Sequence, residues 1–200
     1  KEVLDEYGIL FVSDEVQTGW GRTGEHFWGI GAHGFTPDVM TFAKGLGNGM
    51  AIGGVVARAS LMDGIAANSI STFGGNPLAT AAALATVDYV VAHDLQANAL
   101  KVGTRLLDEL RDLGARLPNV GDVRGKGLMA AVELVVPGTD TPDPAAAGRA
   151  MEETKARGLL VGKGGRYGNV LRIAPPLTLT EAEADEGLGL LAASLTAVTG

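Results

Sequence analysis

The sequence predicts an α/β fold that continues into a smaller α+β domain. The first part alternates short apolar runs with glycine-rich connections, a pattern typical of strands in a mostly parallel sheet. Beyond Pro118, short strands alternate with amphipathic helices. Apolar residues make up 46% of the 200 residues, so the chain can bury a core. We place the boundary at residue 95, which gives domains 1–95 and 96–200.

Three apolar runs supply the expected strands of the first domain. They cover 8–12, 38–43 and 52–57, and each contains β-branched residues and ends near turn formers. Glycine-rich segments, GWGRTG and GLGNG, lie between them. An alanine-rich helix should follow, with Asn76 as its N-cap and Pro77 at its first position.

A long helix is expected to join the two domains and to end near residue 116. Asp94 is its expected N-cap. Its apolar residues recur at helical spacing, at Leu95, Ala99, Val102, Leu106 and Leu110.

The second domain should contain two strands and two further helices. Thr180 and Glu183 form a capping box at the start of the last helix, and Gly158 should end the helix before it. The expected strands are 128–135 and 170–174, the expected helices are 145–157 and 181–197, and a surface loop is expected over 137–144.

Composition excludes several classes of function. The formal net charge of −7 argues against binding to a nucleic-acid backbone. The absence of cysteine excludes disulfides and thiolate metal sites and fits a reducing compartment, so we expect a cytoplasmic protein. No apolar run reaches the ~18 residues that span a bilayer. The three histidines have no ligand spacing, and we expect no metal site.

Two ionisable residues follow predicted strands, Asp14 after the first and Lys44 after the second. In open α/β sheets, ligands bind beyond the carboxyl ends of the strands. A lysine that forms an imine and a carboxylate that keeps a pyridine nitrogen protonated are the pair that pyridoxal phosphate needs. The alternative is that Asp14 caps a turn and Lys44 is a solvated surface residue.

Five motifs in a consistent order resemble those of the class III (omega-type) aminotransferases. HFWG and GLLVGKG further resemble the alanine–glyoxylate subgroup. The five are FVSDEVQTGWGRTG at 11–24, PDVMTFAKGLGNG at 37–49, STFGGNP at 71–77, VRGKGL at 123–128 and LRIAPPL at 171–177. The resemblance implies the fold-type I architecture, with 1–95 in the cofactor-binding large domain and 96–200 as the small domain.

The resemblance also implies a role for each matching residue near the cofactor, pyridoxal 5′-phosphate. Asp14 would bind the pyridine nitrogen, and Val16 would pack against the ring face. Gln17 would hydrogen-bond near the phenolic oxygen. Lys44 would form the Schiff base and later move a proton. Val16 could instead be an ordinary core residue.

Two further residues would bind the cofactor phosphate and the substrate. Thr72 would contact the cofactor phosphate of a neighbouring subunit, which implies a homodimer or a dimer of dimers with shared active sites. Arg172 would bind a substrate carboxylate through its two-pronged guanidinium. Thr72 could instead cap a helix, and Arg172 could pair with a structural acid. Arg22 and Arg124 are interpreted as structural.

The implied activity is transfer of an amino group from alanine or an omega- or beta-amino acid to an oxo acid such as glyoxylate or pyruvate. Alternatives are a phospho-lyase or aminomutase with the same cofactor, and a non-catalytic scaffold. Family members are roughly twice this long, so we interpret the chain as their C-terminal half. It would lack the phosphate cradle and, alone, bind the cofactor poorly. The motifs do not fix the donor, the acceptor or the oligomeric state.

Overall fold

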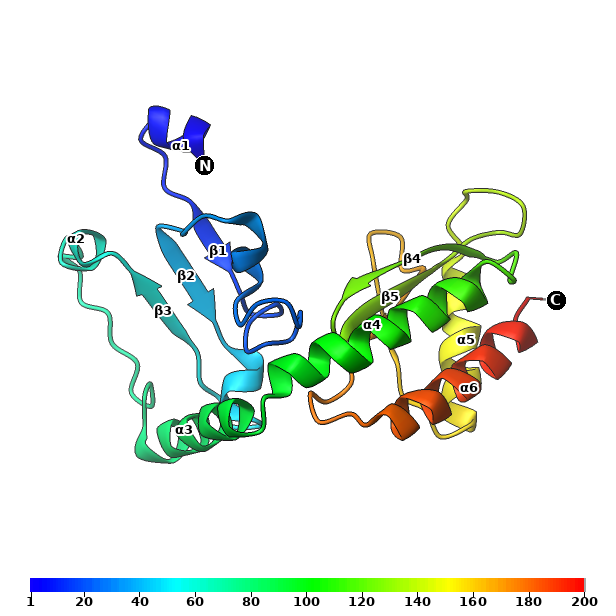
Figure 1. The fold of residues 1–200 in the computed structure, drawn as a ribbon. Coiled ribbons are helices and arrows are strands. Elements are labelled where there is room, and N and C mark those ends of the chain that lie inside the picture. The colour runs from blue at the N-terminus through cyan, green and yellow to red at the C-terminus, as the bar shows by residue number, and fades with distance from the viewer. Residues whose placement is uncertain (200) are drawn as a thin grey trace. The chain divides into compact units, whose positions relative to one another are not determined.

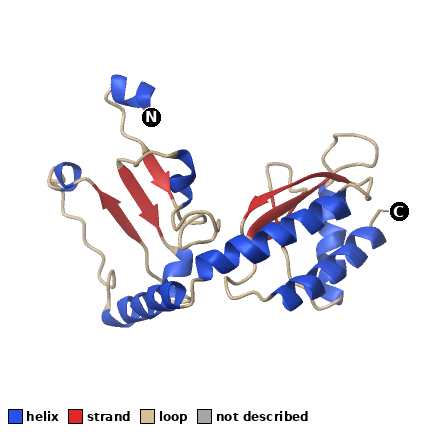
Figure 2. Ribbon diagram, in the orientation of Figure 1, coloured by secondary structure: helices blue, strands red, loops and turns tan. Residues whose placement is uncertain are grey.

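The computed structural model describes residues 1–199. The chain divides into two compact units, Lys1–Gln96 and Ala97–Gly200. Both units combine helices with a sheet, so the mixed α/β architecture expected from the sequence is confirmed (Figure 2).

The first unit is built on a three-stranded sheet in the order β1-β2-β3 (Figure 1). β1 pairs with β2 in parallel, and β2 pairs with β3 antiparallel. The elements of this unit are α1 (Glu2–Glu6), β1 (Val12–Asp14), η1 (Gly29–His33), β2 (Val39–Phe42), η2 (Lys44–Gly47), β3 (Gly54–Ala57), α2 (Ala59–Met62) and α3 (Pro77–Ala92), where η marks a 3-10 helix.

The first strand differs from its prediction. The run 8–12 was expected to form it, but β1 begins at Val12 and ends at Asp14. A side chain explains the late start, because the N–H of Phe11 donates to the carboxylate of Asp38 at 2.8 Å rather than to a neighbouring strand. The strand-end aspartate therefore belongs to the strand itself, which fixes its backbone by ladder hydrogen bonds.

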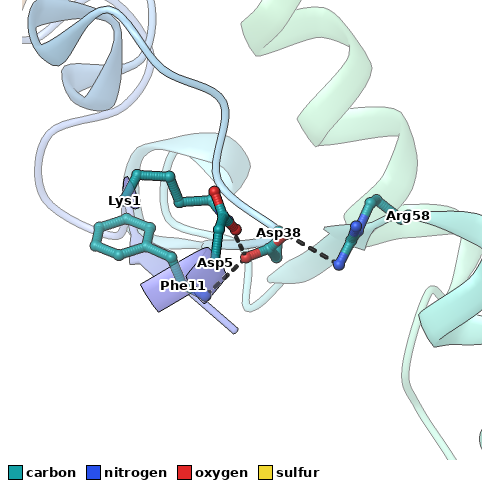
Figure 3. A network of polar contacts seen from close by, with 5 residues as sticks. All are labelled: Lys1, Asp5, Phe11, Asp38 and Arg58. Atoms are coloured by element: carbon teal, nitrogen blue, oxygen red, sulfur yellow. Dashed lines mark hydrogen bonds and ion pairs between the residues drawn. The ribbon is translucent and has the colours of Figure 1, made fainter. Parts of the chain in front are cut away.

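Asp38 is the centre of a polar network at the start of β1 and β2 (Figure 3). Its carboxylate accepts from Lys1 at 2.9 Å and pairs with Arg58 at 3.0 Å, and Lys1 also pairs with Asp5. Hydrogen bonds from the N–H of Phe11 and the ammonium of Lys1 hold the pKa of the Asp38 carboxyl below its ordinary value. The network joins α1 to the residues that precede β1, β2 and α2.

The long helix α3 begins as the sequence predicts. The side chain of Asn76 accepts from the N–H of Ala79 at 3.0 Å, and Pro77 occupies the first turn. This proline has no N–H to leave unpaired, and its fixed φ suits a helix start.

The second unit pairs a four-stranded antiparallel sheet, in the order β4-β5-β7-β6, with three helices. Strands β4 and β6 were not predicted, because VGDVRGK and GKG lack the apolar run of a buried strand. The elements are α4 (Leu95–Gly114, which starts in the first unit), β4 (Val120–Lys126), β5 (Met129–Leu134), α5 (Pro144–Ala156), β6 (Gly162–Gly164), β7 (Val170–Ile173) and α6 (Glu181–Ala197).

The core of this unit lies between one face of the sheet and the three helices. Alternate residues of β5 point into it, and the side chains between them lie on the opposite, outer face. The predicted stripe of α4 is confirmed, since all five of its residues are buried. The core includes Ala99, Val102, Leu106 and Leu110 of α4, Val132 and Leu134 of β5, Ala147 and Ala150 of α5, Leu171 of β7, and Leu191 and Leu195 of α6.

The predicted ends of the last two helices are also confirmed. Thr180 and Glu183 form the reciprocal capping box of α6. Gly158 follows Arg157, the C-cap of α5, and has a φ of +88°, the left-handed conformation that commonly ends a helix. No single helix among residues 1–199 is long and apolar enough to cross a membrane; only α3 and α4 taken together pass that test, by length and composition.

Candidate active site

Two neighbouring strands place Asp14 and Lys44 at the same end of the first sheet. Asp14 is the last residue of β1, and its partner across the parallel ladder is Thr41 in β2. Lys44 follows β2 and opens η2. Parallel strands end at a common border, so the carboxylate and the amine flank one region beyond the sheet, where ligands of α/β proteins bind.

The Asp14 carboxylate is held through one of its two oxygens. Oδ1 accepts from the N–H of Val16 at 3.1 Å and from the hydroxyl of Thr41 at 3.3 Å. The first contact is a local turn bond, and the second ties the carboxylate to the neighbouring strand. Within residues 1–199 no donor contacts Oδ2, and the side chain is exposed. Asp14 therefore presents a fixed acceptor to a ligand.

Lys44 adopts a backbone conformation that is rare for a residue with a side chain. Its φ is +44°, in the left-handed region. Such a conformation costs about 1–3 kcal/mol and persists only where the surroundings impose it, which is most common at functional sites. The side chain is exposed and forms no hydrogen bond or ion pair with any other residue of 1–199. The amine is thus available on a strained turn.

An aromatic cluster, Trp20, Phe27, Trp28 and Phe42, lies behind this turn. The Trp20 ring is 5.5 Å from that of Phe42 and 4.7 Å from that of Trp28, centroid to centroid. A Cβ built at Gly45, the residue after Lys44, would lie 3.7 Å from Cδ1 of Trp20. Trp20 is itself left-handed, with a φ of +64°, and its buried indole N–H has no partner among the described residues. The cluster therefore packs, through Trp20, against the backbone of the turn that carries Lys44.

Glu15, the residue after Asp14, is buried to 1% exposure and fastens the following loop to β1. Burial raises the pKa of its carboxyl, but its hydrogen bonds lower it by more, so the pKa lies below its ordinary value. The donors are the hydroxyls of Thr18 at 2.5 Å and Ser13 at 3.2 Å and the N–H groups of Gly29 at 2.8 Å and Ile30 at 2.7 Å. The carboxylate thereby fixes the start of η1.

The other residues assigned to the cofactor differ in their position. Val16 is half-buried and bonds Asp14, and Gln17 is exposed in the same turn. Thr72 lies in an exposed turn before α3, and no hydrogen bond joins it to Asp14 or Lys44 within residues 1–199. The structure thus places Val16 and Gln17 in the turn that follows Asp14, and it forms no hydrogen bond between Thr72 and Asp14 among residues 1–199.

Arg172 belongs to the second unit. It lies on β7, exposed on the outer face of the sheet, opposite Ala131 of β5 and Gly162 of β6. Arg124 lies in the same cross-strand row and pairs with Asp122 at 2.6 Å and Glu133 at 2.7 Å, which fits its structural interpretation.

A family model described as aminotransferase class-III matches residues 1–195. The chain belongs to this family. Class III aminotransferases are pyridoxal-phosphate-dependent transaminases, so the resemblance seen in the motifs is confirmed for the family and its cofactor.

Curated relatives of different specificity resemble the chain about equally. It is 42% identical over 192 residues to the 5-aminovalerate aminotransferase of Pseudomonas putida, covering 96% of this chain and 45% of that protein. It is 44% identical over 186 residues to a mitochondrial alanine–glyoxylate aminotransferase 2 homologue of Arabidopsis thaliana, covering 92% and 39%. The chain thus spans less than half the length of these relatives, and identity does not single out the alanine–glyoxylate subgroup.

Solved structures confirm the fold. A phospholyase from Arthrobacter, in complex with phosphoethanolamine, superposes with a TM-score of 0.92 at 38% identity, covering 98% of this chain and 47% of that one. This class III chain therefore has the architecture expected of a part of the fold-type I transferases.

The residues present fit part of the cofactor. Asp14 offers a fixed oxygen, Oδ2, that suits a protonated ring nitrogen, and Lys44 offers an amine for the aldehyde. Both belong to neighbouring strand ends of one sheet. Within residues 1–199 no hydrogen bond joins the one phosphate-binding candidate, Thr72, to either of them.

Three supporting residues were missed by sequence reasoning. Thr41 orients Asp14, Glu15 fastens the next loop, and Trp20 backs the lysine turn. A carboxylate directly after a strand-end aspartate was the available signal for Glu15. No sequence signal marked Thr41 or Trp20. Thr41 contacts Asp14 because β1 pairs with β2, and Trp20 contacts the lysine turn because the loop after β1 folds back against it.

Proposed function

We propose that this chain contributes Lys44 and Asp14 to the active site of an aminotransferase that uses pyridoxal phosphate. The amino donor would be alanine or an omega- or beta-amino acid, and the acceptor an oxo acid such as glyoxylate or pyruvate. One observation carries the proposal: Asp14, oriented by Thr41 and Val16, shares a sheet end with the strained Lys44 turn. The family match supports the reaction class.

Each residue has a distinct task in this proposal. Asp14 holds a proton at the ring nitrogen of the bound cofactor through Oδ2. When bound, the cofactor would supply an electron sink for the charge that develops when a substrate carbon loses its proton. The Lys44 amine accepts that proton and returns it to a different carbon. Val16 packs beside the ring, and Gln17 donates near its phenolic oxygen.

Two tasks involve parts of the protein beyond this sheet end. Thr72, in an exposed turn, would hydrogen-bond the cofactor phosphate of a second subunit, so the enzyme would work as a homodimer or a dimer of dimers. Arg172 would bind the carboxylate of the amino or oxo acid, since its guanidinium matches a carboxylate with two parallel hydrogen bonds.

Borohydride trapping tests the central assignment. The complete protein is mixed with pyridoxal phosphate, reduced, digested and mapped by mass spectrometry. We expect the label on the peptide that carries Lys44 and no label in Lys44→Arg. Lys163, on the sheet of the second unit, is a suitable control position, and Lys163→Arg should label as the parent does. Label on a lysine other than Lys44 contradicts the proposal.

A second candidate function is a phospho-lyase acting on an amino alcohol phosphate. The structural match to a phospholyase bound to phosphoethanolamine favours it. Product analysis separates the two. Alanine with glyoxylate should give pyruvate and glycine in an aminotransferase, whereas phosphoethanolamine should release inorganic phosphate in a phospho-lyase.

A further inference from the structure

The side chain of Arg172, which belongs to β7, packs over the neighbouring strand β6, where two of the three residues are glycine. In β6, Gly162 is the cross-strand partner of Arg172, and Gly164 lies two residues further on the same face. On the other side of β7, the partner of Arg172 is Ala131. Arg172 is therefore flanked by the smallest residues on both neighbouring strands.

The contacts of the two glycines show the direction of the arginine stem. A Cβ built at Gly162 would lie 3.6 Å from Cβ of Arg172. A Cβ at Gly164 would lie 2.9 Å from its Cδ and 3.7 Å from its Cγ. The stem thus starts beside Gly162 and crosses β6 over Gly164, toward the turn at 165–168 that joins β6 to β7.

We propose that the bare backbone at Gly164 in β6 is a positioning track for Arg172, which sets the reach of the guanidinium toward the substrate carboxylate. This inference rests on the proposed role of Arg172. Arginine has four rotatable side-chain bonds, and binding must order them. Packing of the aliphatic stem against the backbone of β6 restricts the rotation of those bonds before the substrate binds. Gly164 acts through Arg172 and is a positioning residue.

The two glycines offer a matched pair of substitutions. Neither has a positive φ, so alanine fits the backbone at both positions. At 162 the added methyl makes an ordinary contact at 3.6 Å. At 164 it comes within 2.9 Å of Cδ, and the arginine must move. Gly162→Ala is therefore the control for Gly164→Ala.

Steady-state kinetics of the complete enzyme with pyruvate as acceptor provides the first test. Displacement of a binding group by about 1 Å costs up to about 100-fold. We expect Gly164→Ala to raise KM for pyruvate about 10- to 100-fold and to leave kcat within about twofold. Gly162→Ala should leave both constants within about twofold. In an Arg172→Ala background, Gly164→Ala should add nothing to the rise in KM.

Thermal unfolding gives a readout that does not depend on activity. Gly164→Ala should lower the melting temperature relative to Gly162→Ala by about 2–4 °C, because the added methyl clashes with the arginine stem. With Arg172→Ala the clashing Cδ is gone, and the difference between the two alanine variants should vanish. If Gly164→Ala alone does not fold, recovery of folding in Gly164→Ala/Arg172→Ala supports the contact, and failure of both variants overturns it.

The outcomes separate this inference from the proposed function. If Arg172→Ala leaves KM for pyruvate unchanged, Arg172 does not bind the carboxylate, and the proposed role fails together with the inference. If Arg172→Ala raises KM but Gly164→Ala and Gly162→Ala are alike, the proposed role stands and the positioning track is wrong.

Discussion

Replacing Gly103 with alanine should destabilise the protein, although alanine is the better helix former. Gly103 lies inside α4, where an exposed glycine-to-alanine change normally gains about 1 kcal/mol. In this helix a Cβ would lie 2.2 Å from the carbonyl carbon of Gly127 and 2.3 Å from its oxygen. Both atoms belong to the backbone of the turn between β4 and β5, which cannot rotate away.

The magnitude follows from these distances. Ordinary contact of a Cβ begins at 3.4 Å, so helix and turn must separate by about 1 Å, in a core where overpacking typically costs 1–3 kcal/mol. A separation this large, forced by a backbone atom, belongs to the upper part of that range, about 2–3 kcal/mol, and exceeds the gain in propensity of about 1 kcal/mol. We expect a net loss of about 1–2 kcal/mol, which lowers the melting temperature by about 2–8 °C.

Two other helical glycines serve as controls. A Cβ at Gly189 in α6 meets no atom within 4 Å, and at Gly148 in α5 it meets only the Lys163 amine at 3.9 Å. Gly189→Ala and Gly148→Ala should each raise the melting temperature by about 2–4 °C. Differential scanning calorimetry of the three variants decides the matter. A melting temperature for Gly103→Ala at or above the parent value would refute the close approach of α4 to the turn.

Three further predictions concern the first unit. Thr41→Val removes the hydroxyl that donates to Asp14 and should weaken pyridoxal phosphate binding about three- to tenfold in an absorbance titration, while Thr41→Ser should not. Glu15→Ala leaves two part-buried N–H groups without their acceptor and should cost about 3–5 kcal/mol in urea unfolding, with Glu15→Gln intermediate; equal stability of all three proteins contradicts the loop-fastening role. Because the pKa values of Glu15 and Asp38 are lowered on folding, their stabilisation is complete above about pH 4.5 and is lost as pH falls through the folded values. Melting temperatures between about pH 7 and 3 should therefore fall at the acid end, and less steeply in Asp38→Asn.

The sequence was most informative where a residue's role depends on its near neighbours. The capping box of α6, the Asn76 cap of α3 and the apolar stripe of α4 were all predicted and are confirmed. Such features depend only on residues that are close together in the sequence, so the residue pattern is enough to predict them. The motifs around Asp14 and Lys44 identified the family for the same reason, because each is a continuous segment.

Strand limits and supporting contacts depended on partners far along the chain. β1 starts at Val12 because Asp38, 27 residues after Phe11, takes the N–H of Phe11. β4 and β6 have no apolar pattern of their own and are strands because β5 and β7 pair with them.

The sequence by itself determined the family and most helix ends, and it singled out Asp14 and Lys44 as the candidate pair at the cofactor. Only the tertiary structure decided how these groups are held: Thr41 beside the carboxylate, the left-handed turn at the lysine and the glycine strand under Arg172. The physical reason is that hydrogen bonds and steric contacts act between atoms within about 4 Å, whatever their separation in the chain. Spacing along a sequence predicts such contacts only within one element.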